Sequence, residues 1–222
     1  MFAYCGNNPT NKIDQTGELG AWWQTALSVG AIVAGLALTA TGVGGVAGAM
    51  LVSAGASSLV GGELSEANGG SYTAGWIGGG ISGAICGGGA ALAGNLFSLA
   101  TDLVGPACLG KVAEAVGISY GTGVLGNAIG DLVTNAKDHK ESDIGKVIGS
   151  ACLKGISNVY AGIGCGMTTV VIPPSGPAIS RSLGIFISVT AQAVSDGINT
   201  LFGRLTSKAP HKQSSRVAFE IQ

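Results

Sequence analysis

Residues 75–87 read Gly75-Trp76-Ile77-Gly78-Gly79-Gly80-Ile81-Ser82-Gly83-Ala84-Ile85-Cys86-Gly87. Glycine occupies every fourth position of this stretch, at Gly75, Gly79, Gly83 and Gly87. In a helix, residues four apart lie on one face, so this face is bare and a second backbone can approach it closely. The same spacing supports helix packing in lipid, whereas in water each helical glycine costs about 1 kcal/mol relative to alanine. The stretch therefore predicts close helix packing and favours a membrane environment. The alternative interpretation is a glycine-rich spacer with no membrane role.

The four-residue glycine spacing recurs elsewhere in the chain. We predict helix-packing positions at four further pairs, which are Gly44 and Gly48, Gly117 and Gly121, Gly126 and Gly130, and Gly162 and Gly166. Self-association of the protein through such glycine faces is a further expectation.

The composition is unusual for a soluble domain. Charged residues make up 10% of the 222 residues, against about 25% in ordinary soluble domains. Aromatic residues make up only 5%, and 40 residues are glycine, so large side chains that fill a core are scarce. The net charge of −1 gives no indication of nucleic-acid binding.

Two long segments carry no charge, from Leu19 to Gly62 and from Ala67 to Thr101. About 20 apolar residues suffice for a helix to cross a bilayer. The first segment has a break near residues 41–45, so it holds one long span or two short helices in a hairpin. Tryptophan is enriched at membrane interfaces, and we expect this role for Trp22, Trp23 and Trp76. The alternative is a hairpin buried inside a soluble helical bundle.

A search for catalytic or metal-binding motifs gives no convincing site. The chain has two histidines, His139 and His211, and lacks the spacing of a zinc protease, a phosphate-binding loop or a serine hydrolase. Asp138, Glu141 and Asp143 crowd the loop around His139 without a pocket to hold them. Asp143 or Ser142 instead suits the start of the next helix. We therefore predict no catalytic residue, no cofactor, no metal and no enzymatic activity.

The N-terminal residues differ from the rest of the chain. Tyr4, the run Asn7-Asn8-Pro9, Asn11, Asp14 and Gly17 resemble the last motif of the RHS repeat-associated core, found in rearrangement-hotspot and related YD-repeat proteins. The resemblance covers about 17 residues. It implies the end of a β-cocoon shell, followed by a variable C-terminal domain that is very often a toxin against competing bacteria. Asp14 matches the aspartate that takes part in self-cleavage in many members, although Gln15 replaces the proline that follows it.

We predict a mainly α fold with five to seven Gly/Ala-rich helices in hairpin pairs and a short extended N-terminal segment. Residues 1–18 would be the end of the RHS core, residues 19–203 a glycine-zipper domain, and residues 204–222 a basic tail.

The predicted function is that of an RHS-type effector that inserts into a target membrane and forms a pore or leak. The expected partners are lipid, further copies of the chain and a membrane-embedded immunity protein, and no nucleic acid. No signal peptide is recognised, so delivery by another route is expected. Two alternatives stay open, namely a non-catalytic packing or translocation segment and a soluble toxin enzyme with an unrecognised site.

Overall fold

The computed structural model describes residues 22–40 and 45–171 of the chain. Every regular element in these ranges is an α-helix, which confirms the predicted mainly α class. The five helices of this part are α1 (Trp22–Ala40), α2 (Gly45–Ala67), α3 (Tyr72–Thr101), α4 (Pro106–Lys137) and α5 (Ile144–Val171). The expected N-terminal extended segment and the basic tail lie outside the described residues.

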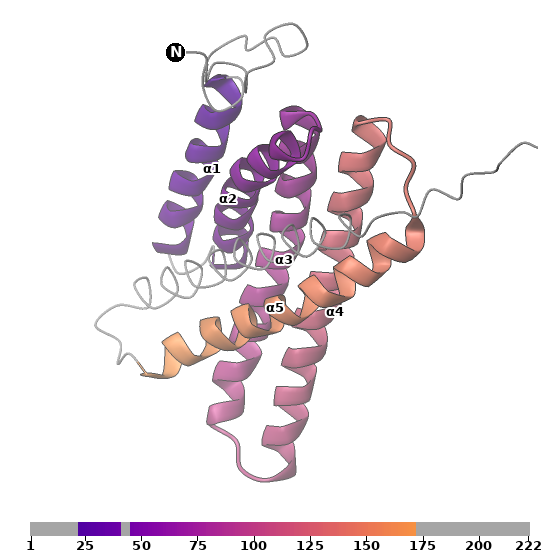
Figure 1. The fold of residues 1–222 in the computed structure, drawn as a ribbon. Coiled ribbons are helices and arrows are strands. Elements are labelled where there is room, and N and C mark those ends of the chain that lie inside the picture. Colours follow the sequence, from indigo (N-terminus) through magenta and orange to yellow (C-terminus); the bar gives the residue numbers. More distant parts are fainter. Residues whose placement is uncertain (1–21, 41–44, 172–222) are drawn as a thin grey trace, which may run out of the picture.

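The first four helices run up and down side by side in chain order, and α5 crosses α3 and α4 obliquely (Figure 1). Consecutive helices contact each other, and α5 packs on both members of the α3–α4 hairpin. With 30 residues, α3 is about 45 Å long. The α3–α4 hairpin therefore extends beyond the shorter α2 at one end.

The hairpin turns follow from local sequence. Gly69 between α2 and α3 has φ of 76°, and Gly105 between α3 and α4 has φ of 75°. Glycine enters this left-handed region without the steric cost that a side chain imposes. Pro106 follows as the first residue of α4, a position where its missing N–H leaves no hydrogen bond unmade.

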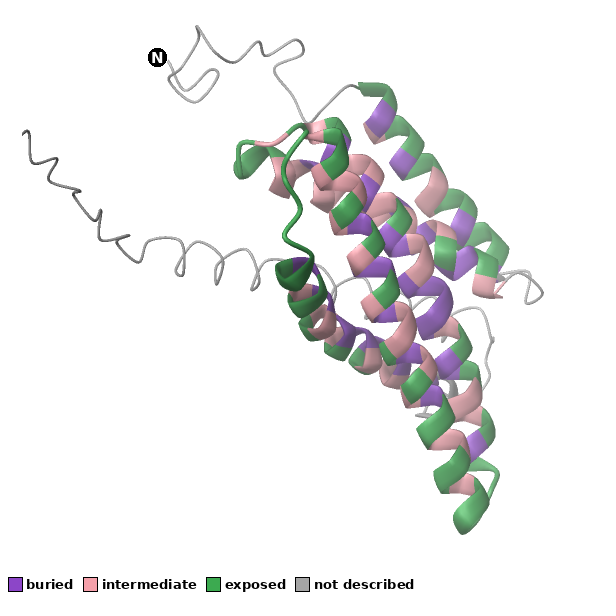
Figure 2. Ribbon diagram, turned by 90° about the vertical axis from the view of Figure 1, so that its right-hand side faces the viewer, coloured by how far each residue is buried: buried purple, intermediate pink, exposed green. Residues whose placement is uncertain are grey.

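The interior of this bundle is built from small side chains. Alanine, glycine and serine supply most of the buried positions, and the largest side chains that are fully buried among the described residues are Gln24, Thr39, Cys86, Ser53 and Ser119. Figure 2 shows these buried positions where the helices face one another. The interior therefore contains no fully buried leucine, isoleucine or aromatic ring within the described ranges.

The outer surface carries the large apolar side chains instead. Leu27 is 58% exposed, Val33 is 61% exposed and Leu125 is 60% exposed. On α5, Leu153 and Tyr160 are 61% and 67% exposed. An exposed apolar surface of this extent is informative, because soluble proteins normally bury such residues. The described part of the chain thus places small residues inside and large apolar residues outside.

Candidate functional site

The predicted glycine row of α3 lies along α2. A Cβ atom on Gly87 would lie 2.8 Å from the carbonyl oxygen of Ala49. Cβ atoms on Gly75, Gly79 and Gly83 would overlap the carbonyl oxygens of Gly61, Ser57 and Ser53, in that order. The two backbones are therefore in direct contact along this face, and any side chain at these glycines would force them apart.

The opposing face of α2 has the same four-residue spacing. It consists of small residues at Ala49, Ser53, Ser57, Gly61 and Ser65. Two small-residue rows in antiparallel helices thus interlock, which is the geometry that lets helices approach closely. The sequence interpretation missed this row because serine, and not glycine, supplies most of it.

A second bare face of α3 receives α4. A Cβ atom on Gly130 would lie 2.7 Å from the carbonyl oxygen of Gly78, and one on Gly126 would lie 2.8 Å from the Cys86 sulfur. Between these points, the Ser82 hydroxyl of α3 donates to the side-chain oxygen of Asn127 of α4 at 3.3 Å. The long α3 helix is therefore held between α2 and α4 at backbone distance on both sides.

Glycine also sets the outer helix contacts. A Cβ atom on Gly48 would lie 2.6 Å from the carbonyl oxygen of Gly35, which joins α1 to α2. Gly44, its predicted partner in spacing, lies outside the described residues. On α5, a Cβ atom on Gly162 would lie 3.1 Å from that of Ala93, and one on Gly166 would lie 3.3 Å from the Gly94 carbonyl oxygen. These positions bring α5 onto α3.

Polar side chains join α5 to α4. The Asn158 side-chain amide donates to the Ser119 carbonyl at 2.7 Å, and the Ser119 hydroxyl donates to the Asn158 carbonyl. Both side chains are at least 95% buried. Reciprocal bonds of this kind satisfy buried groups that would otherwise destabilise the bundle.

Gly117 and Gly121 differ from the other predicted pairs. No heavy atom of another described element lies within 4 Å of a Cβ built on either residue. Gly117 is exposed, because α5 and α3 contact the other faces of α4 through Ser119, Gly123 and Gly126. No described helix therefore packs on this pair, and its role in helix packing stays a prediction.

The three tryptophans gather at one end of the bundle. Trp22 and Trp23 begin α1, with exposed fractions of 77% and 49%. Trp76, in the second turn of α3, meets Trp23 edge to face with ring centroids 5.6 Å apart. The Trp76 indole N–H donates to the Ser28 hydroxyl at 2.8 Å, so this ring is also fixed to α1.

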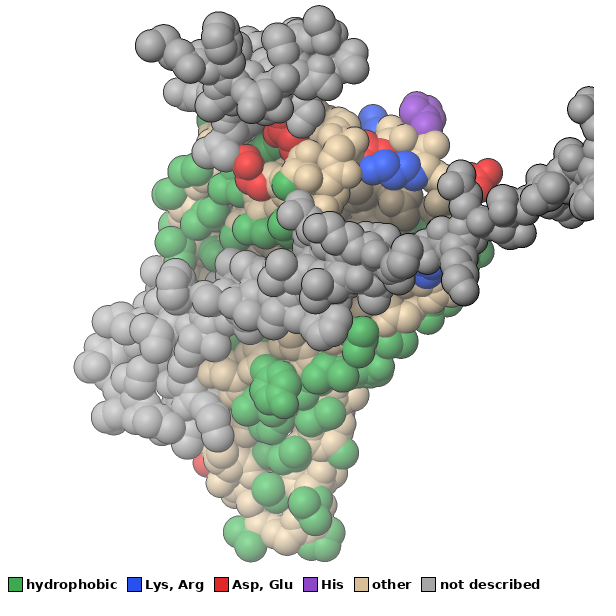
Figure 3. All heavy atoms as spheres, viewed as in Figure 1, with side chains coloured by type: hydrophobic (Ala, Val, Ile, Leu, Met, Phe, Trp, Pro, Cys, Tyr) green, Lys and Arg blue, Asp and Glu red, His purple; other side chains and the backbone are tan. Residues whose placement is uncertain are grey.

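Charged side chains collect at the same end of the molecule, as the face in Figure 3 shows. We call the part formed by residues 63–72 and 131–143 the polar end. The Ser71 backbone N–H donates to the Asp138 carboxylate at 2.9 Å, which ties the α2–α3 turn to the α4–α5 loop. Asp138 also pairs with Lys140 at 3.1 Å, and the side chain of Asp138 is only 4% exposed.

Asp143 fixes the start of α5. Its carboxylate accepts hydrogen bonds from the backbone N–H groups of Gly145 and Lys146. The N–H group of Lys146 holds the pKa of Asp143 below its ordinary value, because the hydrogen bond favours the charged form. The crowded acidic loop therefore separates into a cap at Asp143 and a turn-to-loop link at Asp138.

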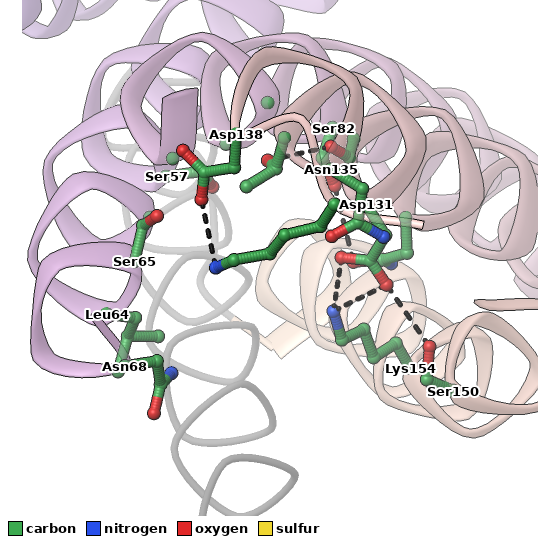
Figure 4. A pocket seen from close by; sticks show the side chains of 18 residues that line it. Ser57, Leu64, Ser65, Asn68, Ser82, Asp131, Asn135, Asp138, Ser150 and Lys154 are labelled. Atoms are coloured by element: carbon green, nitrogen blue, oxygen red, sulfur yellow. Dashed lines mark hydrogen bonds and ion pairs between the residues drawn. The ribbon is translucent and has the colours of Figure 1, made fainter. Parts of the chain in front are cut away.

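A pocket of about 360 Å³ opens at the polar end. The bare backbone of α3 at Gly75, Gly78 and Gly79 contributes to its lining. Figure 4 shows Ser57 and Ser65 of α2, with Asn68 just after it, on one side of the pocket. Asp131 and Asn135 of α4 and Ser150 and Lys154 of α5 lie on the other side. The Lys154 ammonium lies 3.1 Å from the Asp131 carboxylate, which also accepts a bond from Ser150 at 3.1 Å.

Comparison with protein-family models, with curated proteins and with solved structures finds no match for this chain. The N-terminal resemblance to the RHS core therefore stays a sequence-based expectation, and its residues, including Asp14, lie outside the described ranges.

Three helices are long and apolar enough to cross a membrane. They are α1 over Trp22–Thr39, α2 over Gly45–Ala67 and α3 over Tyr72–Thr101. This length and composition are compatible with membrane insertion. Among the described residues, no group of three His, Cys, Asp or Glu side chains is placed to hold a metal ion.

Proposed function

We propose that this chain acts on a target membrane by inserting its glycine-packed helices, which form a pore or leak. The observation that carries the proposal is the distribution of side chains, with small residues inside and large apolar residues outside. In water, folding is driven by burial of large apolar side chains. In lipid, apolar side chains face the hydrocarbon without penalty, and small residues let helices pack.

The energies favour a lipid environment. Full burial of a leucine, valine or isoleucine side chain stabilises a soluble protein by about 1.5–3 kcal/mol. Leu27, Val33, Leu125 and Leu153 are each more than half exposed in this bundle, so a soluble fold would forgo much of that stabilisation. Hydrocarbon around the outer surface restores it without any change in the helix contacts.

The N-terminal resemblance supports a more specific role. We infer that the chain is the C-terminal effector of an RHS-type protein, delivered to a competing bacterium. Its action needs no catalytic residue, since dissipation of ion gradients is sufficient for toxicity. A membrane-embedded immunity protein is the partner that suits such an effector, because it could meet the inserted helices within the bilayer.

A liposome assay tests membrane action directly. Purified residues 19–222 are expected to release a trapped dye from phospholipid vesicles, since the exposed apolar surface partitions into lipid. Expressed with periplasmic targeting in a bacterium, the chain is expected to collapse the membrane potential before DNA, RNA or translation is affected. Intact potential together with degraded nucleic acid would reject membrane action and favour a soluble toxin enzyme. The absence of both effects would favour a packing or translocation segment.

Self-association is proposed to use the open glycines of α4. The glycine rows of α2 and α3 contact neighbouring helices, whereas no described residue lies within 4 Å of a Cβ built on Gly117 or Gly121. These two residues are four apart on one helix face, so a second copy can approach the backbone there.

The double change Gly117→Leu with Gly121→Leu tests this interface. We expect the variant to fold and to insert, and to lose the oligomers that chemical cross-linking detects in vesicles with the parent chain. The matched control is Gly30→Leu with Gly149→Leu, because both glycines are also open but lie on different helices. Unchanged cross-linking of the first variant would exclude this face as the contact between copies.

A further inference from the structure

The pocket at the polar end has a distinctive balance of groups. Two opposite charge pairs contribute to its lining, Asp131 with Lys154 and Asp138 with Lys140. The other lining residues are glycine, serine, threonine and asparagine, with Leu64 as the apolar exception. Among the described residues, no aromatic ring lines the pocket. A ligand that matches this lining is small, polar and carries both charges.

The position of the pocket in the bundle corresponds to the phospholipid headgroup region, where small groups that carry both charges are abundant. The pocket is formed at the polar end, where α2 ends and α3 begins, and two of the three helices of membrane-spanning length therefore meet there. The tryptophan pair Trp23 and Trp76 lies at the same end, and tryptophan is typical of the headgroup region. If α1 to α3 span a bilayer, this pocket faces phospholipid headgroups.

We propose that the pocket binds a zwitterionic phosphoethanolamine group. In this arrangement, Lys140 and Lys154 donate hydrogen bonds to the phosphate oxygens, and Asp131 and Asp138 accept them from the primary ammonium. The group occurs in the headgroup of phosphatidylethanolamine and in soluble phosphoethanolamine, and the pocket recognises the chemistry that both share. The lipid source rests on the proposed function, whereas the site itself does not.

The charged side chains have the capacity for these bonds. A lysine ammonium has three donors and a carboxylate has about four acceptor positions. Lys140 is half exposed, with 50% of its side chain open to solvent, and Asp131 is 32% exposed. Their partners Asp138 and Lys154 are 4% and 15% exposed, so each pair presents one solvent-accessible member, Lys140 or Asp131, to a ligand.

The same chemistry excludes the choline group. A quaternary ammonium has no N–H donor for Asp131 or Asp138, and proteins recognise it mainly through the faces of aromatic rings. The residues in the described ranges that line the pocket include no such ring. Phosphocholine is therefore expected to bind much more weakly than phosphoethanolamine, although the two ligands carry the same formal charges.

Calorimetric titration of the full chain in maltoside micelles tests the site with O-phosphoethanolamine as the probe. The expected result is saturable binding by the parent chain, with weaker binding of phosphocholine, ethanolamine and glycerol phosphate. Lys140→Gln and Lys154→Gln each remove a charge-assisted donor, so each is expected to weaken binding about tenfold or more. Lys111→Gln is the matched control, because it breaks an exposed pair with Glu114 far from the pocket.

The outcomes separate the site from the membrane action. No saturable binding by the parent, or equal binding by Lys140→Gln, Lys154→Gln and Lys111→Gln, would overturn the site. Circular dichroism checks that each variant keeps its helices, and the exposed Lys140 variant serves if Lys154→Gln unfolds. Dye release from phosphatidylcholine and phosphatidylglycerol vesicles measures insertion without the ligand. Leakage without phosphoethanolamine binding rejects only the site, and binding without leakage rejects only the membrane function.

Vesicles identify the source of the ligand. Addition of phosphatidylethanolamine to the vesicles is expected to strengthen binding of the parent chain and of Lys111→Gln, and to have a smaller effect on Lys140→Gln. That result supports a lipid headgroup as the ligand. An equal effect on all three chains, together with specific binding of O-phosphoethanolamine, supports the soluble compound.

Discussion

Gly79→Leu combined with Gly83→Leu is expected to separate α2 from α3 and to abolish dye release. Two opposing effects act on this variant. Leucine raises helix propensity by about 1 kcal/mol at each position. Against this, the new Cβ atoms at positions 79 and 83 would overlap the backbone carbonyl oxygens of Ser57 and Ser53 in α2. A helix backbone cannot relieve such an overlap by changing rotamer, as a flexible side chain can. Overpacking of this kind costs about 1–3 kcal/mol or more per site, so packing outweighs propensity.

Chemical denaturation measures the stability of the Gly79/Gly83 variant, and vesicle leakage measures its dye release. The control is Gly30→Leu with Gly149→Leu, which introduces the same two residues at glycines with no described neighbour within 4 Å. The control is expected to gain stability from propensity, and the Gly79/Gly83 variant to lose it. Equal stability and equal leakage of the Gly79/Gly83 variant and the parent would show that the tight α2–α3 contact is unimportant.

Val33→Asp combined with Leu36→Asp is expected to abolish membrane insertion while leaving the helical bundle folded. Both side chains lie on the outer surface of α1, with exposed fractions of 61% and 41%. An aspartate near the centre of a spanning helix costs about 2.5–3.5 kcal/mol, so the pair costs about 5 kcal/mol or more. Exposed substitutions in water usually change stability by only about 0.5 kcal/mol.

Vesicle flotation and circular dichroism separate these effects. Val33→Ala with Leu36→Ala is the control, because it removes the large apolar side chains without adding charge. The aspartate variant is expected to remain in solution with its helices intact, whereas the alanine control still floats with the vesicles. Flotation of the aspartate variant at the level of the control would mean that this face of α1 does not meet lipid.

The helices and the small-residue character of their contacts could be predicted because both signals are local. The spacing of Gly75, Gly79, Gly83 and Gly87 shows which face of a helix is bare, and a charge-free segment shows where a long apolar helix can form. Spacing does not show what lies opposite. Gly117 and Gly121 have the same pattern as Gly126 and Gly130, yet only the second pair meets α3.

The polar pocket could not be predicted for a similar reason. Asp131 and Lys154 are 23 positions apart and belong to different helices, and the bond from Ser71 to Asp138 joins residues 67 positions apart. The Asp131–Lys154 contact depends on the angle at which α5 crosses the hairpin, and contacts at Ser119, Asn158 and Gly162 hold α5 at that angle. The Ser71–Asp138 bond depends on how the α2–α3 turn lies beside the end of α4. Gly162 belongs to a predicted glycine pair, but neither Ser119 nor Asn158 forms a motif that sequence alone singles out.

The placement of the tryptophans makes intrinsic fluorescence a measure of how deeply one end of the bundle lies in a bilayer. Its three tryptophans, Trp22, Trp23 and Trp76, all stand near one end of the bundle. Intrinsic fluorescence therefore samples a single level of the molecule and not an average over its length. In a bilayer, lipids that carry a quencher near the phosphate and lipids that carry one near the end of the acyl chain would quench the tryptophan emission to different extents. The ratio of the two would show at which depth this end of the bundle comes to rest.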